Sequence, residues 1–176
     1  MPAARFSDAL NEQIAAELAA SHQYLAVAIH YEDRSLPRLA NLFYGQALEE
    51  REHALMMVKY LLDTSTPVRL SEVAAPRTDF EDHIAPLRLA LDQERAVSDR
   101  ISEISSLARE EGDYLSEQFM QWFLREQVEE VATMSELLEV AQRVCDQPMT
   151  LEEYIAREHS GGGGEDPTAP RAAGTA

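Results

Sequence analysis

Residues 37–63, PRLANLFYGQALEEREHALMMVKYLLD, decide the fold of this chain. Apolar side chains recur in this stretch every three or four residues, which predicts one long amphipathic helix. Pro37 suits the first turn of such a helix. The apolar stripe consists of Leu39, Phe43, Ala47, Ala54, Met57 and Leu61. Two polar side chains, Glu50 and His53, stand in line with this stripe and share one face because they are three residues apart.

The same periodicity predicts three further long helices, over residues 7–34, 84–111 and 114–145, and a short one over 151–158. Only a few residues separate the first two long helices, and likewise the last two, so each pair is expected to be antiparallel. About 18 residues, 64–81, join the two pairs and can extend over about 60 Å. A helix of about 27 residues is about 40 Å long. The segment can therefore cross the whole bundle, which predicts an all-α four-helix bundle with one long crossover and a short fifth helix.

Local signals suggest where these helices begin and end. We expect Ser7 to cap the first helix, Gly112 to end the third, and Thr150 with Glu153 to form a capping box for the short helix. The apolar stripe of the first helix is expected to comprise Leu10, Ile14, Leu18, Leu25 and Ala28. Residues 1–159 are then one domain, followed by a flexible Gly/Pro/Ala-rich tail over 160–176.

Composition narrows the classes of function. The 176 residues include 15 Lys and Arg against 32 Asp and Glu, a net charge of −17. Nucleic acids and anionic membranes are therefore unexpected partners, whereas cations are attracted. The single cysteine excludes a disulfide framework and a four-cysteine zinc site within the chain. No apolar run is long enough to span a bilayer and no secretion signal is visible, so we expect a cytoplasmic protein.

Each long helix carries at least one glutamate within its apolar stripe. These glutamates are Glu17, Glu50, Glu94 and Glu130, and they are accompanied by Tyr24, His53 and Gln127. One such glutamate is usually a structural residue, but four pointing to one axis repel one another unless cations join them. Carboxylates with one imidazole suit Fe, Mn or Zn. The pattern therefore predicts a dinuclear metal site in the middle of the bundle.

The chain resembles the bacterial non-haem ferritins over roughly residues 5–158. The resemblance rests on Glu17, Tyr24, Glu50-x-x-His53, Glu94 and Gln127-x-x-Glu130, in this order and at helix-length intervals. It implies a ferritin-like bundle whose copies assemble into a shell of 24 subunits. Such a shell oxidises Fe²⁺ with O₂ or H₂O₂ and stores the ferric mineral in its cavity.

The resemblance also implies roles for the central residues. The first iron ion would be held by Glu17, Glu50 and His53, and the second by Glu50, Glu94 and Glu130, with Glu50 bridging. Gln127 would either lie next to the iron ligands without binding iron itself or stand on the side where oxygen reacts. Tyr24 would be a hydrogen-bonding or redox neighbour. A third iron site on the cavity side would share Glu130 and add Glu49, Glu126 and Glu129; the alternative for these three is a solvated acidic face.

Two further expectations follow from this resemblance. Arg51 stands where bacterioferritins have their haem-ligating methionine, so no haem is predicted. The fifth helix would line a four-fold axis of the shell and bury Leu151, Tyr154 and Ile155 between subunits.

Two other functions remain open. The first is a ferritin-like di-iron oxidase or peroxidase that acts on H₂O₂ or an organic substrate. Such an enzyme needs a substrate pocket and usually a reductase partner, and little chain remains outside the bundle to provide either. The second is a metal-binding or DNA-protecting shell without oxidase activity. The acidic charge argues against DNA, and the complete set of candidate ligands argues against a silent subunit.

Overall fold

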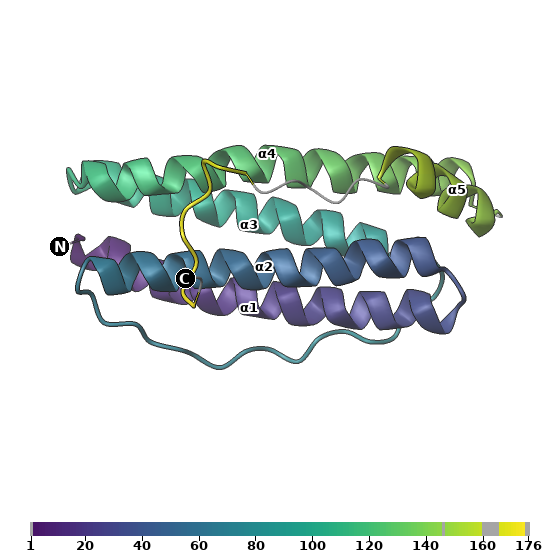
Figure 1. The fold of residues 1–176 in the computed structure, drawn as a ribbon, viewed down its shortest axis with the longest axis horizontal. Coiled ribbons are helices and arrows are strands. Elements are labelled where there is room, and N and C mark those ends of the chain that lie inside the picture. The colour runs from purple at the N-terminus through teal and green to yellow at the C-terminus, as the bar shows by residue number, and fades with distance from the viewer. Residues whose placement is uncertain (1, 146, 160–165, 175–176) are drawn as a thin grey trace.

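A computed structural model describes residues 2–145, 147–159 and 166–174. The described residues form five helices: α1 (Ala4–Asp33), α2 (Pro37–Asp63), α3 (Ala85–Glu110), α4 (Tyr114–Arg143) and α5 (Pro148–Glu158). The four long helices lie side by side, and α5 packs at one end of the bundle (Figure 1). The predicted all-α bundle with one crossover and a short fifth helix is therefore confirmed. No helix in the described residues is long and apolar enough to span a membrane.

The crossover between α2 and α3 runs the length of the bundle beside α1 (Figure 1). Two buried amide side chains of α1 fix it by bonding to its backbone. The Gln23 amide donates to the carbonyl oxygen of Arg77 at 2.9 Å and accepts from the same residue's N–H at 2.8 Å. Asn11 donates to the carbonyl oxygen of Pro67 at 3.2 Å and accepts from the N–H of Arg69 at 2.6 Å. These side chains provide partners that an extended segment without a neighbouring strand would otherwise lack.

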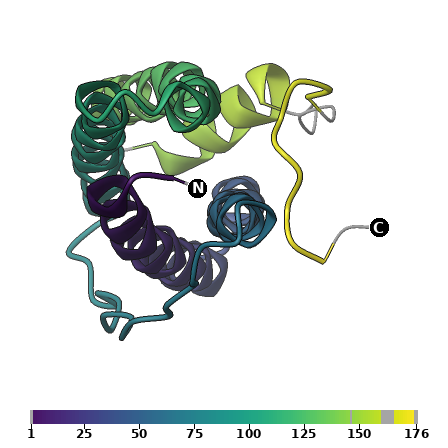
Figure 2. The ribbon, with the colours of Figure 1, turned by 90° about the vertical axis from the view of Figure 1, so that its left-hand side faces the viewer.

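The bundle has two apolar clusters, one toward each end. One cluster contains Tyr24, Phe43, Leu87, Met134 and Leu137 among others. The other contains Leu10, Ile14, Met57, Ile101 and Phe123 among others. The predicted carboxylates fall between these two sets of residues on every long helix. The arrangement therefore places a polar layer between two apolar clusters near the middle of the bundle. Figure 2 shows the long helices of the bundle nearly end-on.

Three local predictions about α1 and α5 are wrong. Helix α1 begins at Ala4, and the Ser7 hydroxyl lies inside it, donating to the carbonyl oxygen of Ala3 at 2.8 Å. Helix α5 begins at Pro148, so Thr150 is a helical residue and not a cap. Leu25 is 41% exposed, because it lies on the outer face of α1 rather than in the buried stripe. Gly112 ends α3 as predicted, with φ at +67°.

Helix α5 docks against its own subunit. Leu151 and Ile155 are buried in the cluster formed by α1 to α4, so their expected burial between subunits is wrong. Tyr154 is partly buried against the same cluster. The carboxylate of Glu152 accepts hydrogen bonds from the N–H groups of Arg38 and Leu39, each at 2.8 Å. Helix α5 thus caps the N-terminus of α2.

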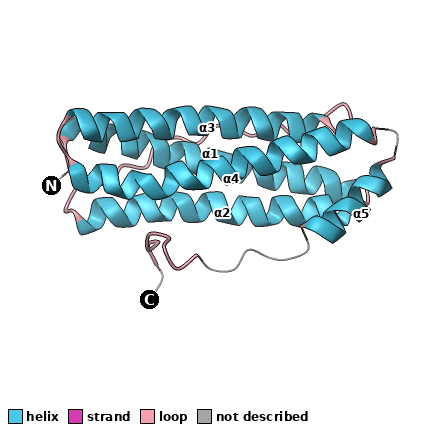
Figure 3. Ribbon diagram, turned by 90° about the horizontal axis from the view of Figure 1, so that it is seen from above, coloured by secondary structure: helices cyan, strands magenta, loops and turns pink. Residues whose placement is uncertain are grey.

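Residues 166–174 lie beside α2 (Figure 3). The Trp122 indole donates to Asp166 at 2.8 Å, and Arg125 donates to the hydroxyl of Thr168 at 3.3 Å. The N–H of Ala173 donates to the carbonyl oxygen of Leu55 at 3.0 Å. This part of the predicted tail therefore links α4 with α2. Residues 160–165 and 175–176 of that tail lie outside the described residues.

Candidate metal centre

The polar layer gathers metal-ligating side chains from all four long helices. Helix α1 supplies Glu17, α2 supplies Glu50 and His53, α3 supplies Glu94 and α4 supplies Glu130, and all five side chains are buried. They are buried because each stands in the apolar stripe of its helix, as the periodicity predicts. A buried carboxylate normally needs a cation or several hydrogen-bond donors. Their partners therefore decide what this layer can bind.

Glu17, Glu50 and His53 form one fully buried group of metal-ligating side chains. One ligand atom from each lies within 4.8 Å of the others. Nδ1 of His53 is 3.6 Å from Oε2 of Glu50, one turn away on α2. Both oxygens of Glu50 and Oε2 of Glu17 have no hydrogen-bond partner among the described residues. These unpartnered oxygens converge with an imidazole, which is a donor set that suits a divalent metal ion.

Glu94 lies on the other side of the layer, where Tyr24 and Gln127 accompany it. The Tyr24 hydroxyl donates to Oε1 of Glu94, whereas Oε2 has no partner among the described residues. Burial raises the pKa of the Glu94 carboxyl, and the side chains of Tyr24 and Gln127 oppose this rise. The Ser98 hydroxyl lies 2.8 Å from Oε1 of Gln127, where it can hold the amide in this orientation. Glu94 therefore has one oxygen held and one oxygen free.

The electrostatics of the layer favour uptake of cations. Burial, together with neighbouring carboxylates, raises the pKa of Glu130 to about 9. Burial raises the pKa of Glu94 to about 7. For Glu17 and Glu50, burial and then the charge of another glutamate raise the pKa well above its ordinary value. Without a cation these groups retain protons near neutral pH, and a bound cation would displace those protons.

A second group lies at the edge of this layer. Ligand atoms of Glu49, His53 and Glu126 lie within 4.8 Å of one another, and both carboxylates are half-buried. Glu129 is exposed and lies outside this group. Its charge nevertheless contributes to the raised pKa of Glu49, after burial. The structure thus brings together two of the three glutamates expected at a third site, with His53 rather than Glu130 as the shared residue.

Sequence reasoning missed Gln13 and Ser98, two polar neighbours of the centre, and the contact between Trp122 and His53. Gln13 donates to Glu17 at 2.8 Å, and Ser98 contacts Gln127. Gln13 is four residues before Glu17 and Ser98 is four residues after Glu94, so same-face helical spacing could have revealed both. Trp122 is buried, and its ring packs against that of His53 with 5.6 Å between centroids. Its bond to Asp166 joins distant parts of the chain and leaves no local sequence signal.

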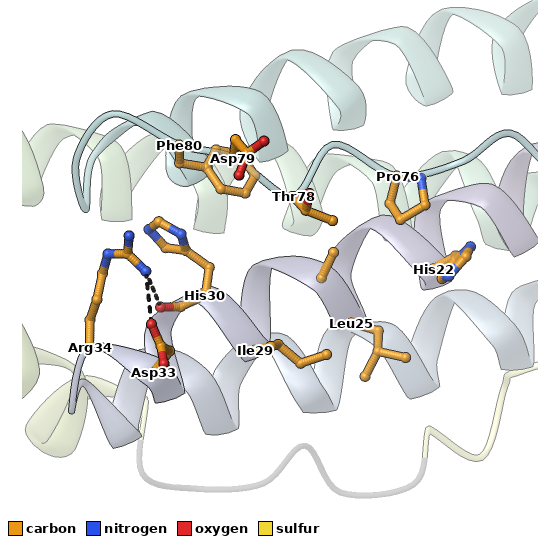
Figure 4. Close-up of a pocket in the computed structure, with 11 residues that line it drawn as sticks. His22, Leu25, Ile29, His30, Asp33, Arg34, Pro76, Thr78, Asp79 and Phe80 are labelled. Atoms are coloured by element: carbon orange, nitrogen blue, oxygen red, sulfur yellow. Dashed lines mark hydrogen bonds and ion pairs between the residues drawn. The ribbon is translucent and has the colours of Figure 1, made fainter.

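A surface cavity of about 510 Å³ lies elsewhere, between one face of α1 and the crossover (Figure 4). Leu25, Ile29, His30 and Phe80 are among its lining residues, and none of the central carboxylates is. A second surface cavity, of about 250 Å³, lies near the N-terminus of α1 and also excludes those carboxylates. Neither cavity supplies the pocket that an oxidase acting on an organic substrate would need at its metal centre.

Four antiparallel helices that direct four glutamates and one histidine into a buried central layer define a ferritin-like metal-binding bundle. The profile of the family described as "Ferritin-like domain" matches residues 7–144. The chain therefore belongs to the ferritin family, as its motifs indicate.

Named relatives agree with this assignment. The chain is 49% identical over 172 residues to Ferritin BfrB of Mycolicibacterium smegmatis, covering 98% of this chain and 94% of the relative. It is 36% identical over 147 residues to a bacterial non-heme ferritin of Staphylococcus saprophyticus, covering 84% and 88% of the two chains. Among solved structures, an open pore ferritin from Archaeoglobus fulgidus superimposes with a TM-score of 0.84 at 27% identity, covering 88% of this chain and 96% of that one.

Proposed function

We propose that this protein stores iron and oxidises Fe²⁺ to Fe³⁺ at a di-iron ferroxidase centre within each subunit. The observation that carries the proposal is the buried layer in which glutamates of four helices meet His53, several of their oxygens having no hydrogen-bond partner among the described residues. Membership of the ferritin family supports the same function. Iron is the substrate of this reaction: two Fe²⁺ ions each give one electron, and O₂ or H₂O₂ accepts the pair together with protons.

The hydrogen-bond pattern suggests which oxygens bind iron. Glu50 has both oxygens free of donors, which suits a carboxylate that bridges two ions. Glu17 and Glu94 each have one oxygen held by a donor and one free, which suits terminal ligands. In this assignment His53 completes the first position and Glu130 the second. Tyr24 positions Glu94 through its hydroxyl, and Gln127 does so through its amide.

Glu49 and Glu126 are proposed to receive iron at the outer edge of the centre. Their half-burial and shared proximity to His53 support a third iron position, to which exposed Glu129 would add negative charge. A half-buried acidic group beside the buried centre can bind cations that pass between the centre and solvent.

The ferric product is proposed to collect in the cavity of a homo-oligomeric shell of 24 subunits, located in the cytoplasm. Support comes from the family and from the outer face of α1, where Leu25 and Ile29 are 41% and 54% exposed beside the cavity of Figure 4. Apolar side chains in such a position favour contact with another subunit. With Arg51 exposed at the expected haem position, we propose that no haem is bound.

Nucleic acids and membranes are not proposed as partners, because the net charge of −17 opposes phosphate-rich surfaces. Residues 1–159 remain the proposed ferritin-like domain and 160–176 the proposed tail.

Iron loading tests the storage function. Purified protein given Fe²⁺ in air should remain soluble and elute as a single large assembly that carries iron far in excess of two ions per subunit. Electron microscopy should show electron-dense cores inside the particles. Precipitation of iron outside the protein, with no cores, would contradict the proposal.

A further inference from the structure

Gln13 is a fully buried amide on α1, one turn before Glu17. Its Nε2 donates to Oε1 of Glu17 at 2.8 Å. Its neighbours on the same helix, Leu10 and Ile14, are buried apolar residues. A core position of this kind ordinarily holds an apolar side chain, so the presence of an amide calls for a reason.

The orientation of this amide indicates that the carboxylate determines it. The hydrogen bond runs from the amide N–H to a carboxylate oxygen. A Glu17 that is ionised by a bound metal ion requires this direction, because an ionised carboxylate can only accept hydrogen bonds. The opposite end, Oε1 of Gln13, has no partner among the described residues. The amide therefore satisfies Glu17 while its own oxygen remains unpaired, which is an unfavourable arrangement for a residue that serves packing alone.

Gln13 forms a hydrogen bond with only one of the two carboxylate oxygens of Glu17. Oε1 is held by Gln13, whereas Oε2 has no partner and belongs to a side chain grouped with Glu50 and His53. The opposite side of the layer repeats this arrangement, since Tyr24 holds Oε1 of Glu94 and leaves Oε2 free.

We propose that Gln13 is a positioning residue for the first metal position, and this proposal rests on the ferroxidase function proposed above. Its N–H group holds one oxygen of Glu17 and so presents the other as a one-oxygen ligand beside His53. Groups that hydrogen-bond to a metal ligand fix its orientation, and their loss commonly weakens metal affinity by about 10- to 100-fold. Gln13 thus has the same role toward Glu17 that Tyr24, which is also on α1, has toward Glu94: each holds one carboxylate oxygen by a hydrogen bond.

Anaerobic titration with Co²⁺ tests the proposal without iron oxidation, because the visible absorption of Co²⁺ reports both occupancy and coordination. The test variant is Gln13→Met in the full-length assembled protein, since methionine has nearly the same shape and cannot donate. We expect affinity at one of the two central positions to fall by about 10-fold or more, with a changed visible spectrum for that ion. The other position should keep its affinity.

Gln23→Met is the matched control. Gln23 is also a buried amide of α1, but both its ends bond to the crossover backbone. This variant should lose thermal stability and keep the parent's Co²⁺ isotherm and spectrum. Gln13→Leu repeats the test with a different apolar side chain, should the methionine variant fail to assemble.

The outcomes separate the two proposals. An unchanged isotherm and spectrum in the Gln13 variants, with a parent that binds two Co²⁺ ions at the centre of each subunit, would overturn the role of Gln13 alone. A parent that binds no Co²⁺ at its centre would overturn the proposed ferroxidase function, and the role of Gln13 with it.

Discussion

The carboxylate of Glu152 accepts a hydrogen bond from the backbone N–H of Leu39 at 2.8 Å, across the contact between α5 and the start of α2. Its other oxygen accepts from the N–H of Arg38 at the same distance. Helix α2 has no capping side chain of its own, because Leu36 occupies its N-cap. A negative charge at this end also complements the helix dipole. Glu152 therefore ties the short fifth helix to the helix that carries the Glu50-x-x-His53 motif.

Replacing Glu152 tests this tie. Glu152→Ala removes the partner of the Arg38 N–H and of the buried Leu39 N–H, and it should destabilise the fold by about 1–3 kcal/mol. Thermal unfolding of the assembled protein should show a lower midpoint than in Glu153→Ala, which removes an exposed neighbour on the same helix. Equal midpoints for the two variants would show that the cap contributes nothing.

The raised pKa of Glu130 predicts how stability depends on pH in the metal-free protein. Burial raises the pKa of Glu130 from 4.5 to about 9, so the folded state keeps a proton that the unfolded state has lost across this interval. Stability should therefore decrease as the pH rises from about 5 to 9. Glu130→Gln removes the titrating group and should flatten this dependence, as measured by thermal unfolding in chelator at several pH values. An identical pH profile in the parent and Glu130→Gln would contradict the assignment.

The same carboxyl groups predict proton release on metal binding. Glu94, with its pKa raised to about 7, and Glu130 retain protons near neutral pH, and a divalent ion must displace them. Calorimetric titration with Co²⁺ at pH 7, repeated in buffers of different ionisation enthalpy, should show net proton release. Glu130→Gln should release fewer protons for each ion bound. An observed heat independent of the buffer would mean that the metal binds groups that are already ionised.

Trp122 is the only tryptophan of the chain, so its fluorescence reports on the bond to Asp166. Asp166→Ala should free the indole N–H and loosen residues 166–174 from α4, which would shift the emission. Arg171→Ala removes an exposed side chain of the same segment and should leave the spectrum unchanged. Spectra of Asp166→Ala and the parent that coincide would mean that the segment does not rest on Trp122 in solution.

The outer group can be tested by counting metal ions. Glu126→Ala should abolish one bound Co²⁺ per subunit and leave the two central ions in place, because Glu126 contributes to the group of Glu49 and His53 and not to the central group. Glu129→Ala should cause a smaller loss of affinity, since Glu129 is exposed and acts there through its charge. If Glu129→Ala abolishes the third ion as fully as Glu126→Ala does, then Glu129 is a direct ligand.

The long helices and the central carboxylates could be predicted because both follow from the 3.6-residue period. A glutamate within an apolar stripe must point inward wherever the stripe points. Leu25 escaped this reasoning because an apolar residue at the margin of a stripe can lie on either face, and here it lies outward. Capping was harder to predict, because α1 begins three residues earlier than Ser7 suggests and α2 is capped by a residue of α5.

Contacts between distant residues limited the prediction of the site. Tyr24 and Glu94 meet although they are 70 residues apart. The family resemblance placed Tyr24 beside the metal centre but did not indicate Glu94 as its partner. Gln13 carried a readable signal, its four-residue spacing from Glu17, but glutamine is common on helices and the signal has meaning only once Glu17 is assigned as a ligand. The bond of Trp122 to Asp166 depends on where a segment beyond α5 returns, which no local pattern specifies.

The most direct test of the central claim is rapid mixing of O₂ with protein loaded anaerobically with Fe²⁺, monitored by ferric absorbance, in the parent, Glu130→Ala and Glu139→Ala. Glu139 is an exposed glutamate of the same helix and serves as the control. We expect rapid oxidation in the parent and in Glu139→Ala, and a rate lower by about 10-fold or more in Glu130→Ala. Equal, slow oxidation in all three proteins would mean that the buried carboxylates do not form a ferroxidase centre.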